Sequence, residues 1–158
     1  MKKAKNHIDP DKIKVVNIKT VKGNIDSTAD STPKIGGYEF KFGLKSGLDI
    51  EKKYVGLHLL IEIEAKDDAD NNIGIHGSYT HEIVFKVENL DDFVTHGTPD
   101  PDNTDALFLD GGIGSTLVSI AYSTIRGIIY NRTQGTSLGT VILPIIDPKK
   151  LITNPPTS

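Results

Sequence analysis

The sequence predicts an α+β fold, in which an antiparallel sheet of four strands carries one long C-terminal helix on one face. Residues 54–65 and 75–87 alternate apolar and polar side chains, and this alternation indicates strands because successive strand side chains point to opposite faces. The turn-rich residues 66–72 join them, so we expect an antiparallel hairpin. A helical apolar pattern follows only from residue 113, and the order of strands first and helix last is typical of α+β proteins.

Two further strands are expected before the hairpin. Residues 38–45 place aromatic and aliphatic side chains on one face and charged ones on the other, so this strand should pair with the hairpin. Residues 13–23 fit both a helical face and a strand, but their β-branched side chains favour a strand. A polar crossover, residues 24–37, connects these two strands.

The expected helix runs from about residue 113 to the glycine at position 135. Gly114 or Ser115 offers an N-cap, and Gly135 sits where a left-handed C-terminal residue belongs. Val118, Tyr122 and Ile129 lie off the main apolar stripe, so the apolar surface is wider than one sheet face requires. The stripe itself comprises Ile113, Leu117, Ile120, Ala121, Thr124, Ile125 and Ile128.

Length and composition bound the class of protein. A chain of 158 residues fits one domain, which we place at residues 13–151, with flexible ends at 1–12 and 152–158. The net charge of −3 leaves no basic excess for nucleic acid, and the absence of cysteine excludes disulfides and thiol chemistry. No apolar run approaches the roughly 20 residues that span a bilayer, so we expect a cytoplasmic protein without membrane contact.

The histidines and acidic clusters give little support to an enzyme. His76 and His81 should point to opposite faces of one strand, so they cannot share a metal, and His81 reads as a partly buried structural histidine. His96 lies in a long loop, residues 91–112, and has no orienting partner at a known spacing. Residues 66–72 and 88–92 resemble solvated turns more than complete calcium loops. We therefore expect no catalytic residue, metal or cofactor, although a small-ligand or hydrolytic protein built around His81 or His96 stays an alternative.

Apolar side chains in the long loop and the second strand suggest a binding surface. They either complete the core or line a groove that accepts extended apolar chains without reading their sequence. The candidate peptide-binding residues are Tyr38, Phe40, Phe42, Phe93, Leu107, Phe108 and Leu109.

Two short motifs follow each other in the C-terminal part of the sequence. Residues 131–136, Asn-Arg-Thr-Gln-Gly-Thr, end the expected helix, and residues 141–147, Val-Ile-Leu-Pro-Ile-Ile-Asp, follow as an apolar run with a proline. This pattern resembles the SecB family of export chaperones, which end their main helix in a similar Arg-Gly-Thr turn, followed by an apolar segment, a proline and a final helix. Together with the order of the elements, the likeness spans residues 13 to about 151.

This resemblance implies a SecB-like fold and function. The fold would be a four-stranded antiparallel sheet with a long helix on one face, in a homo-oligomer, either a dimer or a tetramer. The activity would be ATP-independent holding of unfolded or extended polypeptide, either a preprotein in protein transport or an antitoxin. Apolar residues of the helix would then lie at the oligomer interface, and the candidates are Val118, Tyr122 and Ile129 off the main stripe, with Ile125 on it.

Departures from the family pattern narrow this expectation. Residues 120–124 replace the Pro-Tyr-Ala-Arg step of the export chaperones, and His76 and Ser78 are expected to be exposed where those chaperones present a carboxylate. Both departures argue against docking to the translocase motor. Two prolines also leave room for only a reduced final helix. The main alternative is an oligomerising structural or interaction module with the same fold and no general chaperone activity.

Overall fold

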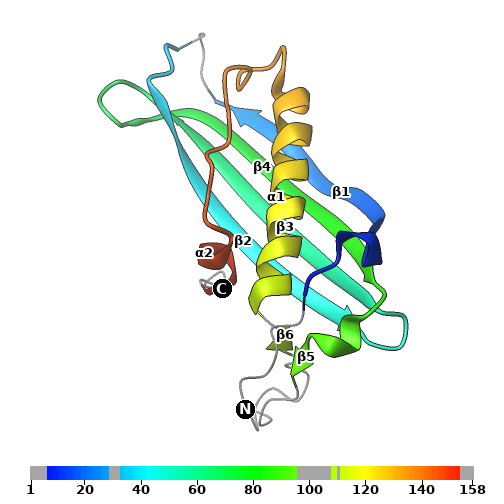
Figure 1. Cartoon of the computed structure of the whole chain (residues 1–158). Helices are drawn as coiled ribbons and strands as arrows, with labels where there is room; N and C mark the ends of the chain where they lie inside the picture. The colour runs from blue at the N-terminus through cyan, green and yellow to red at the C-terminus, as the bar shows by residue number, and fades with distance from the viewer. Residues whose placement is uncertain (1–6, 29–32, 96–107, 110, 154–158) are drawn as a thin grey trace, which may run out of the picture.

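The computed structural model describes residues 7–28, 33–95, 108–109 and 111–153. Helix α1 lies across one face of a long sheet, and the extended segment between the two α-helices runs beside it over β2 (Figure 1). In chain order the elements are η1 (Pro10–Lys12), β1 (Ile13–Ser27), β2 (Gly37–Asp49), β3 (Tyr54–Lys66), β4 (Asn72–Val87), η2 (Leu90–Asp92), β5 (Val94–Thr95), β6 (Phe108–Leu109), α1 (Gly111–Thr133) and α2 (Pro148–Thr153).

The main sheet has the strand order β1-β4-β3-β2, and all its pairs are antiparallel. The predicted hairpin of β3 and β4 is confirmed, as is the pairing of β2 with that hairpin. Because β1 pairs with β4, the chain crosses from one edge of the sheet to the other between β1 and β2. β1 and β2 are therefore the two edge strands.

The central strands bury the face that their alternation predicts. The apolar residues of β3 and β4 face α1 and form most of the core, while their polar neighbours point to the opposite face. The buried residues on the α1 side are Val55, Leu57, Leu59, Ile61, Ile63 and Ala65 of β3, and Ile75, Gly77, Tyr79, His81, Ile83, Phe85 and Val87 of β4.

The turn between β3 and β4 uses its acidic residues to shape the backbone. Asp67 Oδ1 accepts hydrogen bonds from the backbone N–H groups of Ala69 and Asn71, both at 2.9 Å. The bond from the Asn71 backbone is the main reason that the pKa of Asp67 lies below its ordinary value. Asp70 adopts a positive φ of 65°, which aspartate tolerates in turns. This acidic cluster is a solvated turn, as the sequence indicated.

β1 is a strand interrupted by two irregularities. Its register with β4 shifts between Val15 and Asn17 and again between Thr20 and Lys22. Each shift inserts one residue that has no partner on β4, so the alternation of side chains changes phase twice along β1. These shifts explain why the segment fitted neither a regular helix nor a regular strand.

Helix α1 begins earlier than predicted, at Gly111 instead of near Gly114 or Ser115. The glycines at positions 111 and 112 suggested that the helix starts after them, because glycine disfavours a helix interior. They lie in the first turn, however, where the N–H groups have no intrahelical hydrogen-bond partners. At the other end, Gly135 has a φ of 75°, the left-handed conformation predicted for it.

The buried side of α1 is also rotated relative to the predicted stripe. Ile120 is exposed, whereas Val118, Tyr122 and Ile129 are buried. The reason is that α1 packs against two neighbours, the sheet and the extended segment that follows the helix, so its buried arc extends beyond the stripe on the side of Val118, Tyr122 and Ile129.

The chain after α1 is anchored to the sheet by Leu138. This side chain is buried, and its Cδ1 atom lies 2.8 Å from the position that a Cβ atom on Gly77 would occupy. Residues 140–147, which we call the strap, then lead to the short helix α2, so the reduced final helix is confirmed. No helix among the described residues is long and apolar enough to cross a membrane.

Candidate polypeptide-binding surface

The aromatic side chains of β2 form a row beneath the strap. The ring centroids of Tyr38 and Phe40 lie 6.2 Å apart, and those of Phe40 and Phe42 lie 6.3 Å apart. Phe42 also contacts Tyr122 of α1 edge-to-face at 5.9 Å, and the Tyr38 hydroxyl is hydrogen-bonded to Thr140 Oγ1 at 2.6 Å. All three aromatic residues of β2 are half-buried. Three of the predicted peptide-binding residues are thus brought together.

The other predicted peptide-binding residues do not join this row within the described part of the chain. Phe93 is buried in the core. Leu107 lies outside the described residues. The backbone of Phe108 and Leu109 forms β6, which pairs with β5, and the positions of their side chains are not described.

The strap is held to α1 through its own carbonyl groups. Arg126 Nε donates a hydrogen bond to the Leu143 carbonyl at 2.8 Å, and the Tyr122 hydroxyl donates to the Pro144 carbonyl. Burial raises the pKa of Tyr122 to about 12, against a smaller opposing effect of Arg126, so the hydroxyl stays protonated as a donor. The strap is therefore a fixed extended segment.

Fixing the strap leaves some of its isoleucines in solvent. Val141 and Leu143 are buried, whereas Ile142 is 60% exposed and Ile145 is 86% exposed. Ile120 and Tyr130 of α1 and Ile152 of α2 are exposed as well. α1, the strap and α2 lie on the same face of the sheet (Figure 1), so this face carries most of the exposed apolar side chains outside β1.

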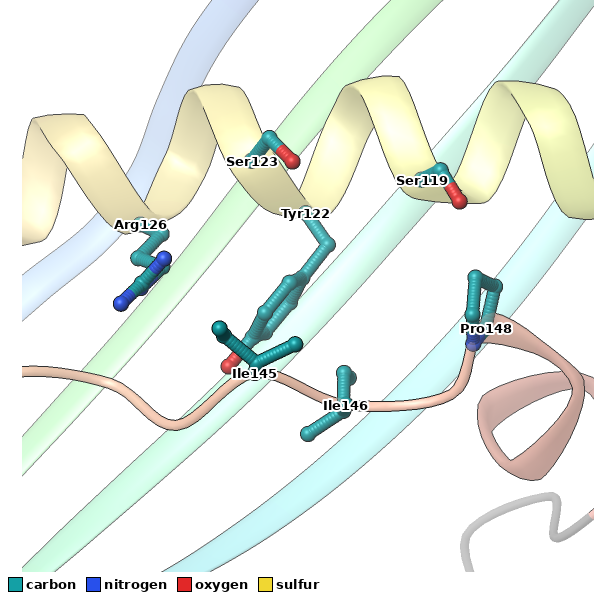
Figure 2. Close-up of a pocket in the computed structure, with 7 residues that line it drawn as sticks. All are labelled: Ser119, Tyr122, Ser123, Arg126, Ile145, Ile146 and Pro148. Carbon is teal, nitrogen blue, oxygen red and sulfur yellow. The ribbon is translucent and has the colours of Figure 1, made fainter.

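A pocket of about 210 Å³ opens between α1 and the strap (Figure 2). Residues of α1 supply its polar side, and the strap with the first residue of α2 supplies its apolar side. Among the described residues that line it, Arg126 alone carries a charge. The lining residues are Ser119, Tyr122, Ser123, Arg126, Ile145, Ile146 and Pro148.

The four candidate interface residues of α1 lie inside this protomer. Val118, Tyr122, Ile125 and Ile129 are all buried against the chain's own sheet and strap. The exposed apolar residues of α1 are Ile120 and Tyr130 instead. Any contact of α1 with a second subunit would therefore use this outer side of the helix.

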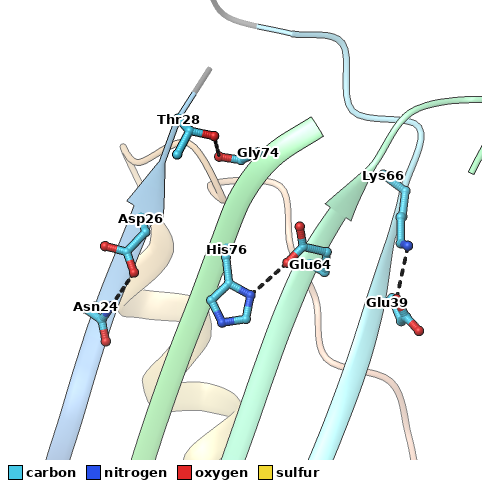
Figure 3. Close-up of polar contacts among 8 residues, drawn as sticks. All are labelled: Asn24, Asp26, Thr28, Glu39, Glu64, Lys66, Gly74 and His76. Atoms are coloured by element: carbon cyan, nitrogen blue, oxygen red, sulfur yellow. Dashed lines mark hydrogen bonds and ion pairs between the residues drawn. The ribbon is translucent and has the colours of Figure 1, made fainter. Parts of the chain in front are cut away.

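The opposite face of the sheet is polar. His76 Nδ1 lies 2.8 Å from Glu64 Oε2, and Lys66 Nζ lies 3.1 Å from Glu39 Oε2 (Figure 3). Ser78 is buried by its neighbours and is not exposed as predicted, because side chains of adjacent strands flank it on both sides in the middle of the sheet. In the described segments no three metal-ligating side chains gather into a site.

His81 is fully buried on the α1 side of the sheet. Its ring stacks on Tyr79 with centroids 6.5 Å apart, and neither ring nitrogen has a hydrogen-bond partner in the described structure. Burial, with a smaller contribution from the nearby charge of Arg132, lowers the pKa of His81 below its ordinary value. His81 is therefore a neutral core residue, and His96 lies outside the described residues.

Sequence reasoning missed Arg126, Ile142 and Ile145 as members of this surface. The signal that could have found the isoleucines is the run of residues 141–146, in which five branched aliphatic residues surround one proline. An extended segment has two faces. A run that is apolar on both faces must expose one of them unless other elements of the protein cover both.

A four-stranded antiparallel sheet covered on one face by a long helix, with a short final helix, is a SecB-like α+β fold. The chain aligns with the SecB-like chaperone Rv1957 of Mycobacterium tuberculosis over 86% of its own length and 91% of that chain, with a TM-score of 0.59 and 15% sequence identity. That chaperone was solved in complex with a ChAD peptide from the Rv1956 HigA1 antitoxin. Comparison of the sequence with protein-family models and with curated proteins gives no match.

Proposed function

We propose that this protein is an ATP-independent chaperone, a holdase or adaptor that binds unfolded or extended polypeptide along α1 and the strap. The observation that carries the proposal is the exposure of Ile142 and Ile145 on a strap that hydrogen bonds hold in place. Large apolar side chains that a rigid backbone presents to water favour contact with another apolar surface. The half-buried aromatic row of β2 would extend this surface.

The SecB-like fold supports an extended polypeptide as the client. The chaperone of similar fold was solved with a peptide from an antitoxin, and its likeness to this chain covers 86% of the chain. Full burial of one isoleucine contributes roughly 1.5–3 kcal/mol, so affinity should follow the apolar area of the client more than its sequence. A preprotein or an antitoxin would both satisfy this chemistry.

Replacing both exposed strap isoleucines by serine, Ile142→Ser with Ile145→Ser, is expected to weaken client binding by at least tenfold. Two large apolar contacts are lost, and each is worth about a factor of ten or more if it is well buried in the complex. Suppression of aggregation of a denatured reference protein, measured by light scattering, reports the effect. The fold should be retained, because neither side chain belongs to the core.

A matched control for this experiment is Val21→Ser. Val21 is an exposed aliphatic residue of β1, at the edge of the sheet away from the strap. It should suppress aggregation as well as the unmodified protein. Equal loss of activity in both variants, or no activity in the unmodified protein at stoichiometric excess, would contradict the proposed function.

A second candidate function, an oligomerising interaction module, is favoured by the edge strand β1. Val15, Val16, Ile18 and Val21 are 44–52% exposed on a strand whose outer edge pairs with no other strand among the described residues. An exposed apolar edge strand of this length is a ready site for pairing with another chain. The same surface would also allow a chaperone of this fold to form a dimer or tetramer.

Changing Ile18 to lysine is expected to shift the protein to a smaller species. A charged side chain in the middle of an apolar strand edge opposes strand-to-strand pairing, because the ammonium group would have to lose its water. Sedimentation velocity checks the result, with Lys19→Ala as the control on the polar face of the same strand. An unmodified protein that already sediments as a monomer would remove this role for β1.

A further inference from the structure

Arg126 lines the pocket between α1 and the strap, and none of the described residues gives it an anionic partner. Its Nε atom is occupied by the Leu143 carbonyl, which fixes the guanidinium group and leaves its two terminal nitrogens as donors. In the described part of the chain, no carboxylate comes within salt-bridge distance of Arg126. A half-buried, oriented guanidinium group with spare donors is the geometry that proteins use to bind carboxylates.

The other walls of the pocket restrict what can accompany that carboxylate. Figure 2 shows Arg126, Tyr122 and the two serines on the helix side, facing Ile145, Ile146 and Pro148. The Tyr122 hydroxyl already donates its hydrogen bond to the Pro144 carbonyl. Because its pKa is raised, it stays protonated and does not provide a negatively charged partner for Arg126. The pocket thus has one cationic wall and one aliphatic wall.

The size of the pocket and its apolar surroundings favour one side chain of a bound, extended polypeptide as the occupant. A volume of about 210 Å³ holds several water molecules at ~30 Å³ each, which is room for one or two side chains but not for a folded element. Exposed isoleucines lie before and after the pocket along the chain, at Ile142 and Ile152. A bound segment can therefore continue across apolar surface beyond the pocket.

We propose that this pocket binds an acidic side chain, glutamate or aspartate, carried by an extended client segment that is otherwise rich in aliphatic residues. The proposal rests on the proposed chaperone function and adds a sequence preference to it. Arg126 pairs with the client carboxylate through its terminal nitrogens, while Ile145 and Ile146 contact the neighbouring aliphatic side chain of the client. Apolar area then sets the overall affinity, and Arg126 selects the register in which the client lies.

The test compares fluorescent peptides by anisotropy. Two short amidated peptides share the same aliphatic flanks and differ only in a central glutamate or glutamine; a third carries the glutamine and a free C-terminal carboxylate. The glutamate peptide is expected to bind about tenfold more tightly than the glutamine peptide, since a hydrogen-bonded pair of opposite charges exceeds a neutral one by roughly that factor. In Arg126→Gln, which keeps a donor for the strap, this preference should disappear.

The matched control is Arg132→Gln. It removes the same charge from an exposed position of the same helix, outside the pocket, and should keep the preference for glutamate. Circular dichroism of both variants shows whether they stay folded.

The outcomes distinguish a failure of carboxylate recognition by the pocket from a failure of the proposed chaperone function. Equal binding of the glutamate and glutamine peptides to the unmodified protein would overturn carboxylate recognition and leave the chaperone function standing. No binding of any peptide would remove both. Tighter binding of the third peptide than of the glutamate peptide would assign the pocket to chain ends and overturn the assignment to side chains.

Discussion

Leu138→Ala is expected to lower the free energy of unfolding by about 3 kcal/mol, one of the largest effects in this protein. Leu138 is fully buried between the turn after α1 and the sheet, where it packs over Gly77. Truncating a buried leucine removes its transfer free energy and leaves a cavity, which together cost about 2–5 kcal/mol. Denaturant unfolding followed by circular dichroism measures the change. An effect below 1 kcal/mol would show that Leu138 is not an anchor.

The same site allows a test by a double-mutant cycle. A Cβ atom on Gly77 would lie 2.8 Å from Leu138 Cδ1, so Gly77→Ala alone forces Leu138 to move and should destabilise the protein. In the double variant the added methyl group enters space that the leucine has left. The combined loss should therefore be at least 1 kcal/mol smaller than the sum of the single losses. Strict additivity would contradict this packing.

Leu138 also links stability to the binding surface. The strap begins two residues after it, so loosening the turn should loosen the presentation of Ile142 and Ile145. Leu138→Ala should thus weaken client binding even at temperatures where the protein remains folded. Local amide hydrogen exchange in residues 138–146 would show the coupling directly.

Acidification from pH 7 to pH 5 is expected to destabilise the protein through His81. Burial lowers the pKa of His81 in the folded state, so the unfolded state binds the proton first as the pH falls. The contribution of His81 to the free energy of unfolding is fully present above the ordinary histidine pKa of about 6.5. This contribution is lost as the pH falls through the lower pKa of the folded state. The slope contributed by one proton is at most about 1.4 kcal/mol per pH unit.

His81→Leu should remove this part of the pH dependence. Both ring nitrogens lack hydrogen-bond partners in the described structure, so a leucine of similar size should keep or raise stability at pH 7. Denaturant unfolding at pH 7, 6 and 5 gives the slope. An unchanged slope in His81→Leu would assign the acid sensitivity elsewhere.

The sheet could be predicted from the sequence because β3 and β4 alternate over most of their length. The alternating positions 55–65 of β3 and 75–87 of β4 are the ones buried under α1. The irregularity between these two strands lies near their turn, where the register shifts between Glu64 and Lys66. β1 was harder because its two register shifts break the alternation, so that Val15 and Ile18 share a face although three positions separate them. Only pairing with β4, a long-range contact, shows which residues of β1 lie on which face.

The candidate site was less predictable than the fold. The aromatic row of β2 followed from simple alternation, whereas the rotation of α1 depended on a second neighbour, the strap, that helical periodicity does not reveal. The pocket at Arg126 depends on two hydrogen bonds from helix side chains to strap carbonyls. Each of these contacts joins a single pair of residues that lie far apart in the sequence, so no repeating sequence pattern predicts them.

The pairing of β1 with β4 also constrains how the protein is made. Ile13 pairs with Val87 and Ser27 with Ile75, so the first strand to leave the ribosome stays without a partner until the other three have been synthesised. At about 5–20 residues per second, this wait lasts several seconds, during which the valines of β1 are open to misassociation. Lys14, Lys19 and Lys22 are interleaved with these valines, and charged side chains of this kind oppose premature association of a nascent strand.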